Sequence, residues 1–140
     1  MLRFCDIKAQ SYKMGFGIIL AVALGGAVGA VGRFLLSTYI HKLLGSGFAY
    51  GTLSVNVLGS LIIGFLFMFF EQTISPTQKA LLVTGLMGAL TTFSTFSLET
   101  VLMLQSGLFF KAFINILANV TLSIGATLVG MAIFKKLYGF

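Results

Sequence analysis

The sequence predicts an all-α membrane protein in which four transmembrane helices form one domain. Only 9% of its residues are charged, whereas about a quarter are charged in a typical soluble domain. Four stretches contain no charged residue, and each is at least 19 residues long: 14–32, 48–70, 80–98 and 112–134. A helix of about 20 apolar residues can cross the roughly 30 Å hydrocarbon core of a bilayer. We therefore expect a multi-pass protein of the plasma membrane.

The positive charge of the chain also fits a membrane protein. The formal net charge is +6, which in a soluble protein would suggest nucleic acid as a partner. Here most basic residues lie near the ends of the apolar stretches: Lys13, Lys42, Lys79, Lys111, Lys135 and Lys136. Such positions favour anchoring at the membrane interface, so we expect the lipid bilayer as a partner and no nucleic acid. The single cysteine, Cys5, excludes a disulfide within the chain.

Residues 1–13 form a polar N-terminal extension ahead of the membrane domain, which we place at 14–140. Two other interpretations of this start are a cleaved signal peptide and translation from Met14. With four helices, both termini and the second connection lie on one side, which carries six basic residues against two or three opposite. This count favours cytoplasmic termini. Without the extension the two sides are balanced, and the chain could insert in either orientation.

The first apolar stretch combines a helix-packing motif with a charge at its end. Gly25 and Gly29 form a GxxxG pair, which lets two helix backbones approach closely in lipid. Arg33 follows four residues later on the same face. Counted from Met14, it lies roughly 28 Å along the helix, near the far interface. It either extends harmlessly into that interface or raises the local concentration of anions at a vestibule.

The second stretch carries a polar stripe. Thr52, Asn56 and Ser60 recur every four residues, which places them on one face of a helix. Asn56 lies about 12 Å from the start of the stretch, close to the bilayer centre. A carboxamide at that depth needs hydrogen-bond partners. It can bond to another helix or line a polar path, and its position leaves both interpretations open.

The third stretch predicts a helix that is broken near the membrane midplane. Ser75 is a suitable N-cap with Pro76 at the first helical position, and glycines and paired threonines weaken the helix over 85–92. Such interruptions are tolerated in a bilayer only where they are buried in protein or line a polar path. Backbone carbonyls released at the break would be natural ligands for a hard cation such as Na⁺.

Beyond this break the helix carries polar and aromatic residues. Thr91, Thr95 and Glu99 follow at four-residue spacing, and Glu99 lies roughly 12 Å from the midplane, just inside the hydrocarbon edge. A carboxylate there is either functional or extends to the interface. Phe93 and Phe96 lie about 60° apart on the helix. Their positive ring edges could face an anion, although spacing alone favours a packing or lipid-facing role.

The fourth stretch repeats the pattern of the second over a longer distance. Four polar residues follow at four-residue spacing: Asn115, Asn119, Ser123 and Thr127. One such residue could be incidental, but four in succession indicate a helix that lines a water-filled crevice. The second, third and fourth helices thus each present one polar stripe.

The sequence contains no recognisable set of catalytic or metal-binding side chains. It has no nucleophile–base pair and no phosphate-binding loop, and its one histidine, His41, lies in a connection. We therefore do not expect an enzyme. Neutral donors, aromatic edges and a broken helix are instead the components of an anion pathway. Hydroxyl and amide groups can replace the hydration water of a small anion without trapping it beside a full charge.

From about Met14 to its end, the chain resembles the Fluc (CrcB) family of fluoride channels. The resemblance rests on three segments in the same order: GGAVGAVGR at 25–33, GTLSVN at 51–56 and, most specifically, GALTTFSTFSLE at 88–99. It implies passive export of cytoplasmic fluoride across a bacterial inner membrane, which lowers fluoride toxicity. It also implies an antiparallel, dual-topology homodimer with two fluoride pathways and one structural Na⁺ at its centre.

Carried onto this chain, the resemblance assigns the Na⁺ site to two backbone carbonyls, those of Gly88 and Thr91. It assigns the ion pathway to polar and aromatic side chains of all four helices: Arg33, Thr52, Asn56, Phe93, Thr95, Phe96, Glu99 and Ser123. Within this set Phe93 and Phe96 would be the pore phenylalanines, and Asn56 a pore amide donor. Arg33 would lie at a vestibule.

Two departures from the family pattern stand out. Ala89 follows Gly88 where a second glycine is common, although carbonyl ligands need no glycine at that position. Asn115 and Asn119 occupy positions where aromatic or hydroxyl side chains are expected, so the resemblance assigns them no role.

Two other functions compete with a fluoride channel. A small dual-topology multidrug transporter also has four short helices, but its proton coupling needs a carboxylate in the first helix, and 14–32 contains none. A structural subunit of a larger membrane complex would use the glycine pair and the polar stripes for packing. Stable solitary dimers in detergent would count against that second alternative.

Overall fold

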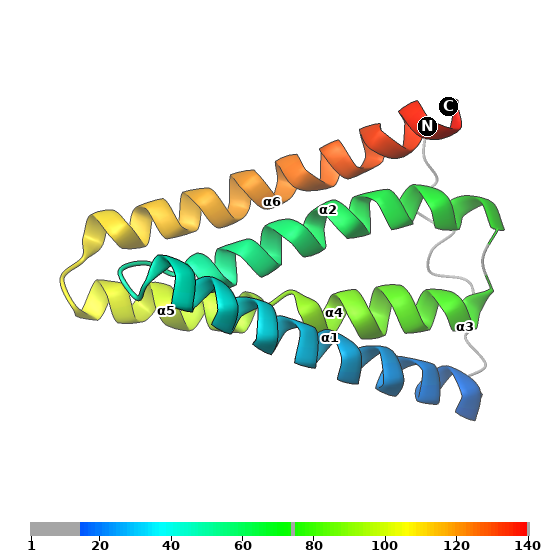
Figure 1. Ribbon diagram of the computed structural model, residues 1–140, viewed down its shortest axis with the longest axis horizontal. Helices are drawn as coiled ribbons and strands as arrows, with labels where there is room; N and C mark the ends of the chain where they lie inside the picture. The colour runs from blue at the N-terminus through cyan, green and yellow to red at the C-terminus, as the bar shows by residue number, and fades with distance from the viewer. Residues whose placement is uncertain (1–14, 74, 140) are drawn as a thin grey trace.

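The computed structural model describes residues 15–73 and 75–139, and these form helices joined by short connections (Figure 1). Within these described residues, four segments are long and apolar enough to cross a membrane. They are α1 (Phe16–Leu44), α2 (Tyr50–Thr73), a third span over Pro76–Gln105, and α6 (Phe109–Tyr138). The predicted all-α fold with four spans is confirmed. The predictions for residues 1–13, including Cys5, lie outside the described residues.

The four spans run back and forth between two ends of the molecule (Figure 1). One end, which we call the terminal end, contains the first residues of α1 and the last residues of α2 and α6. The opposite end, which we call the distal end, holds the connections 45–49 and 106–108. Along their length α6 packs on α2, while α1 packs on the third span. This up-and-down order places the start of α1 and the end of α6 on one side, as expected for four spans.

Glycines allow these helix pairs to approach closely. A Cβ atom at Gly25 or Gly29 of α1 would overlap backbone carbonyl oxygens of the third span. Gly64 of α2 and Gly130 of α6 face the backbone of each other's helix in the same way. The GxxxG pair therefore serves close helix packing, which is what drives association where water supplies no hydrophobic force.

Helix α1 is longer than the uncharged stretch that predicted it. Arg33 was expected near the end of the helix, but α1 continues for eleven residues to Leu44. A charged side chain does not interrupt backbone hydrogen bonding, so counting uncharged residues underestimates the helix. The helix ends where Gly45 adopts a φ of 78°, a conformation that glycine reaches without strain. The prediction that Arg33 lies near a helix end is therefore wrong. Its nearness to the far interface stays a prediction.

The third span consists of four helical segments: α3 (Pro76–Lys79), η2 (Ala80–Met87), α4 (Gly88–Leu90) and α5 (Phe93–Gln105). Ser75 caps its start, and the side chains of Ser75 and Gln78 complete a capping box, as the sequence predicts. The π-helical segment η2 leads into the break. Between α4 and α5 the backbone of Thr91 and Thr92 is extended, so the predicted break is confirmed.

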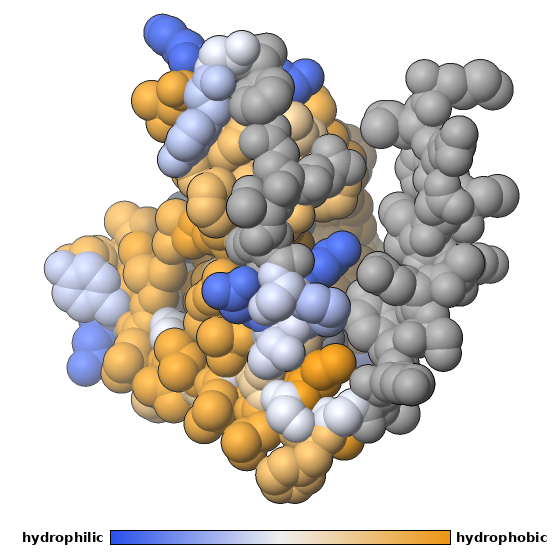
Figure 2. All heavy atoms as spheres, turned by 90° about the vertical axis from the view of Figure 1, so that its right-hand side faces the viewer, coloured by the Kyte–Doolittle hydropathy of each residue, from blue (hydrophilic) through white to orange (hydrophobic). Residues whose placement is uncertain are grey.

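The surface of the molecule matches a protein embedded in lipid. Figure 2 looks onto the terminal end and shows hydrophilic residues gathered there, with hydrophobic side chains around them. Lys79 and the pair Lys135 and Lys136 belong to the segments that reach this end. Large apolar side chains are exposed along all four spans. The chain is therefore a multi-pass membrane protein, with basic residues near the water interface.

Candidate functional site

The break in the third span is organised by threonine side chains. Thr91 closes α4, because its amide and its Oγ1 both donate to the carbonyl oxygen of Met87 at 3.1 Å. Thr92 caps α5, since its Oγ1 accepts from the Thr95 amide at 3.2 Å and donates to Thr95 Oγ1 at 3.0 Å. The paired threonines thus satisfy the ends of both helical segments.

Asn56 of α2 forms hydrogen bonds with the backbone at the break. Its Oδ1 accepts from the Thr92 amide at 2.8 Å, and its Nδ2 donates to the Thr92 carbonyl oxygen at 3.2 Å. The same Nδ2 also donates to Asn119 Oδ1 at 3.0 Å. The carboxamide therefore pairs with an extended backbone much as a neighbouring strand would. Asn56 thus bonds to other helices, which does not exclude the second interpretation, because it also lines the cavity described next.

A cavity of about 460 Å³, which we call the break cavity, lies beside this contact. Six of the predicted site residues line it: Asn56, Gly88, Thr91, Phe93, Phe96 and Ser123. Its volume far exceeds the 10–15 Å³ or so that a single water needs. No side chain of the lining is ionisable. The cavity therefore offers a small ion amide, hydroxyl and aromatic groups, set among aliphatic side chains and without a formal charge.

Phe93 and Phe96, the phenylalanines of the predicted ion pathway, differ in their surroundings. Phe96 is buried, with 8% of its surface exposed, whereas Phe93 is 77% exposed. Their rings contact each other with centroids 5.4 Å apart at an angle of 56°. Both line the break cavity, so one ring is fixed inside the helix bundle and the other stands at its surface.

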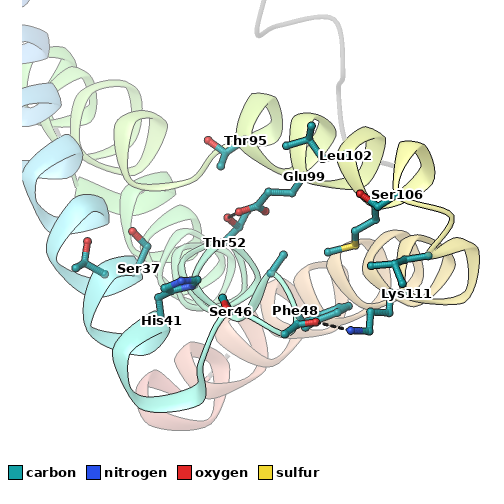
Figure 3. Close-up of a pocket in the computed structure, with 16 residues that line it drawn as sticks. Ser37, His41, Ser46, Phe48, Thr52, Thr95, Glu99, Leu102, Ser106 and Lys111 are labelled. Atoms are coloured by element: carbon teal, nitrogen blue, oxygen red, sulfur yellow. Dashed lines mark hydrogen bonds between the residues drawn. The ribbon is translucent and has the colours of Figure 1, made fainter.

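A second cavity of about 490 Å³, the distal cavity, opens at the distal end (Figure 3). It is lined by the predicted residues Thr52, Thr95 and Glu99 together with His41 and Lys111. Thr52 Oγ1 donates to Glu99 Oε1 at 2.8 Å, and the two side chains face each other in Figure 3. The other carboxylate oxygen, Oε2, is buried and has no hydrogen-bond partner among the described residues. Ionisable groups therefore gather at this cavity.

Arg33 lines a third, smaller cavity of about 190 Å³ between α1, α2 and α5. This cavity shares Thr52 and Thr95 with the distal cavity and Thr92 with the break cavity. Arg33 is thus close to the residues that separate the two larger cavities. All eight predicted pathway residues line at least one of the three cavities.

The polar residues that recur every four positions in α6 do not share one environment, which the sequence did not indicate. Asn119 and Ser123 line the break cavity, but Asn115 is fully buried and borders none of the three cavities. Thr127 borders none of them either, so the predicted water-filled crevice includes neither Asn115 nor Thr127. Asn115 Nδ2 donates instead to Thr100 Oγ1 of α5 at 2.9 Å. Thr100 and Thr92 are the polar residues that sequence reasoning missed, because no spacing along the chain relates them to asparagines on other helices.

Comparison with known proteins decides the family. Residues 20–131 match the model of the family described as CrcB-like protein, Camphor Resistance (CrcB). The chain belongs to the CrcB family. Among its relatives, proteins from Nitratiruptor sp. and Sulfurovum sp. carry the name fluoride-specific ion channel FluC, and each is 58% identical to it. These alignments cover 90% and 87% of this chain, and 98% and 97% of the relatives.

A more distant CrcB relative carries the same name. The fluoride-specific ion channel FluC of Vibrio parahaemolyticus is 49% identical over 86% of this chain and 97% of its own length. The break cavity, the distal cavity and both parts of the third span lie within the residues that match the family. The resemblance inferred from three short motifs is therefore confirmed over most of the chain.

Proposed function

We propose that this CrcB protein is a fluoride-specific ion channel that lets cytoplasmic fluoride leave passively across the bacterial inner membrane. Its relatives from three bacteria bear that name, and its four spans provide a membrane domain of matching length. The observation that carries the proposal is the break cavity, a neutral site at the interruption of the third span. A channel of this kind is a transport protein and not an enzyme.

The ion pathway combines the break cavity with the distal cavity. Fluoride would enter one of them and exchange its water for hydroxyl and amide donors, with Asn56 and Ser123 among them. Phe93 and Phe96 would present their positive ring edges. No fixed charge lines the break cavity, so a bound anion is not trapped. Flow would then follow the electrochemical gradient without coupling to another ion.

A structural Na⁺ fits the break through backbone oxygens. In a continuous helix the amides of Thr92 and Thr95 would bond to the carbonyls of Gly88 and Thr91. Here those amides donate to Asn56 Oδ1 and Thr92 Oγ1 instead. Carbonyl oxygens are suitable ligands for a hard cation, and a bound Na⁺ would add a positive charge beside the anion path. Fluoride flux should fall in sodium-free buffer; equal flux would argue against the site.

A homodimer would complete the site. Gly88 and Phe93 are both exposed in the single chain, although they line the break cavity. A second copy packed there in antiparallel orientation would cover them and bring two breaks together. The small difference in lysines between the two ends of the described residues is compatible with dual topology, with Lys42 and Lys111 opposite Lys79, Lys135 and Lys136. Light scattering in detergent should give twice the 15.0 kDa chain mass, and a monomer would contradict the dimer.

The proposed function is tested by fluoride efflux from liposomes. Purified protein is reconstituted into vesicles loaded with potassium fluoride, and valinomycin is added so that potassium can follow. A fluoride electrode should record rapid efflux, while vesicles loaded with chloride should release almost none. Absence of fluoride efflux, or equal chloride efflux, would refute the proposal.

A further inference from the structure

All three asparagines of the chain belong to one hydrogen-bonded set. Asn56 lies in α2, and Asn115 and Asn119 lie one turn apart in α6. Asn56 Nδ2 donates to Asn119 Oδ1 at 3.0 Å, and Asn119 Nδ2 donates to Asn115 Oδ1, also at 3.0 Å. The three carboxamides therefore form a continuous line from the break cavity into the interior of the bundle.

Both ends of this line return to the first turns of α5. At one end the Thr92 amide donates to Asn56 Oδ1 at 2.8 Å. At the other end Asn115 Nδ2 donates to Thr100 Oγ1 at 2.9 Å, and Thr100 Oγ1 donates to the Phe96 carbonyl oxygen at 2.7 Å. We call the whole set the asparagine chain. It ties α2 and α6 to the segment that carries Phe93 and Phe96.

Every link of the asparagine chain has the same direction. Each carboxamide accepts at its oxygen from the preceding group and donates through its nitrogen to the next. Rotating one amide by 180° would oppose two oxygens on one side and two N–H groups on the other. Because hydrogen bonds in series polarise one another, each link also strengthens its neighbours. The orientation of one amide thus fixes the orientation of the others.

Burial makes this orientation costly to change. Asn115 is completely buried, and Asn119 and Thr100 expose only 6% and 7% of their surfaces. Asn119 Nδ2 additionally donates to the Asn115 carbonyl oxygen at 3.0 Å. A polar group that loses its partner at such a position finds no water to replace it. Asn115 and Thr100 are therefore connected to the break cavity by hydrogen bonds without lining it.

We propose that Asn119, Asn115 and Thr100 are positioning residues that orient the Asn56 carboxamide for the anion. This inference rests on the proposed function, in which Asn56 donates to fluoride. Both bonds of Asn56 Nδ2 are already made, one to the Thr92 carbonyl and one to Asn119 Oδ1. An arriving anion must displace one of these acceptors. The asparagine chain keeps the nitrogen of the Asn56 amide, and not its oxygen, available to the anion, so weakening the asparagine chain should lower fluoride flux.

The first test removes one hydroxyl that is remote from the cavities. Thr100→Val keeps the side-chain shape but leaves Asn115 Nδ2 without its acceptor, and fluoride efflux should fall about three- to tenfold. Thr100→Ser restores the hydroxyl and should restore most of the flux. Thr121→Val is the matched control. Thr121 Oγ1 also donates to the carbonyl oxygen four residues earlier, that of Leu117, but Thr121 is exposed and does not belong to the asparagine chain. Efflux by folded Thr100→Val within twofold of wild type would overturn the proposal.

The second test reads the amides directly and does not depend on flux. Labelling with ¹⁵N-asparagine gives only three side-chain amide signals, which single substitutions assign. Thr100→Val should shift the signal of Asn56 although the two side chains do not touch, whereas Thr121→Val should leave all three unchanged. An unshifted Asn56 signal would overturn the proposal.

A fluoride titration covers the case in which Thr100→Val does not fold. In the wild-type protein fluoride should shift all three amide signals with one half-saturating concentration, and chloride should shift none. A shift confined to Asn56 would overturn the asparagine chain while leaving a fluoride site. Wild-type protein that neither conducts nor responds to fluoride would refute the proposed function itself, and with it the positioning role that rests on it.

Discussion

The break cavity and the distal cavity have similar volumes, about 460 and 490 Å³, but opposite chemistry. The break cavity is lined by amides, hydroxyls, aromatic rings and aliphatic groups without an ionisable side chain. The distal cavity contains His41, Glu99 and Lys111. This difference fits a division of work in which the two cavities have different tasks along one ion pathway. Charges near the water attract ions over a distance, whereas neutral groups at depth replace hydration without holding the ion too tightly.

The largest effect is expected from the aromatic rings of the break cavity. Phe93→Ile should reduce fluoride efflux to the background of empty vesicles, because isoleucine has no positive ring edge to offer. Phe96→Ile should do the same. Light scattering should show that both variants assemble as the wild type does. Phe113→Ile is the control, since Phe113 is also exposed but borders none of the three cavities. Efflux retained by both cavity variants would show that the rings only pack.

A second large effect is expected at Asn56. Asn56→Leu leaves the Thr92 amide without its acceptor, so the free energy of unfolding should fall by about 1–3 kcal/mol. Fluoride efflux should fall with it, since the donor is lost. Thermal unfolding in detergent measures the first effect. Ser60→Ala, on the same stripe of α2, should change stability by less than about 0.5 kcal/mol. Equal stability of Asn56→Leu and wild type would contradict the role assigned to the amide.

Smaller effects are expected at the distal cavity. Glu99→Gln removes a negative charge but keeps an acceptor for Thr52 Oγ1. Efflux at low fluoride concentration should rise about two- to threefold, and this gain should shrink as added salt screens the charge. A gain that is independent of ionic strength would indicate a packing effect instead of a field effect.

The smallest effect is expected at Lys111. Its Nζ donates to the Gly47 carbonyl oxygen at 2.8 Å and adds a positive charge at the distal end. Lys111→Met should lower efflux about twofold at low salt and leave it unchanged at high salt. Lys111→Arg should behave as wild type. If the variants of the distal cavity impaired flux as severely as those of the break cavity, the division of work would be wrong.

The fold was predictable because its signals are local in the sequence. Four uncharged stretches indicated the spans, Ser75 and Pro76 marked a helix start, and the threonine pair after Gly88 marked the break. Each of these features acts through neighbouring residues. The length of α1 could not be predicted from its uncharged stretch, because the helix backbone continues through Arg33 without a penalty.

The site was only partly predictable because its contacts join distant segments. Asn56 meets Thr92 across 36 positions, and Asn115 meets Thr100 across a helix connection. Periodicity showed that each residue shares a face with polar neighbours. It could not show that Asn115 turns into the bundle while Ser123 lines a cavity. That distinction depends on how α6 is rotated against α2 and α5, which packing decides.

The most direct measurement of the central claim is the reversal potential of the current through a single reconstituted bilayer. Fluoride would be held at different concentrations on the two sides, with chloride equal on both. If the neutral break cavity selects fluoride, the reversal potential should follow the fluoride gradient and stay fixed when chloride is changed. A reversal potential that follows chloride, or no current above that of the bare bilayer, would contradict the account.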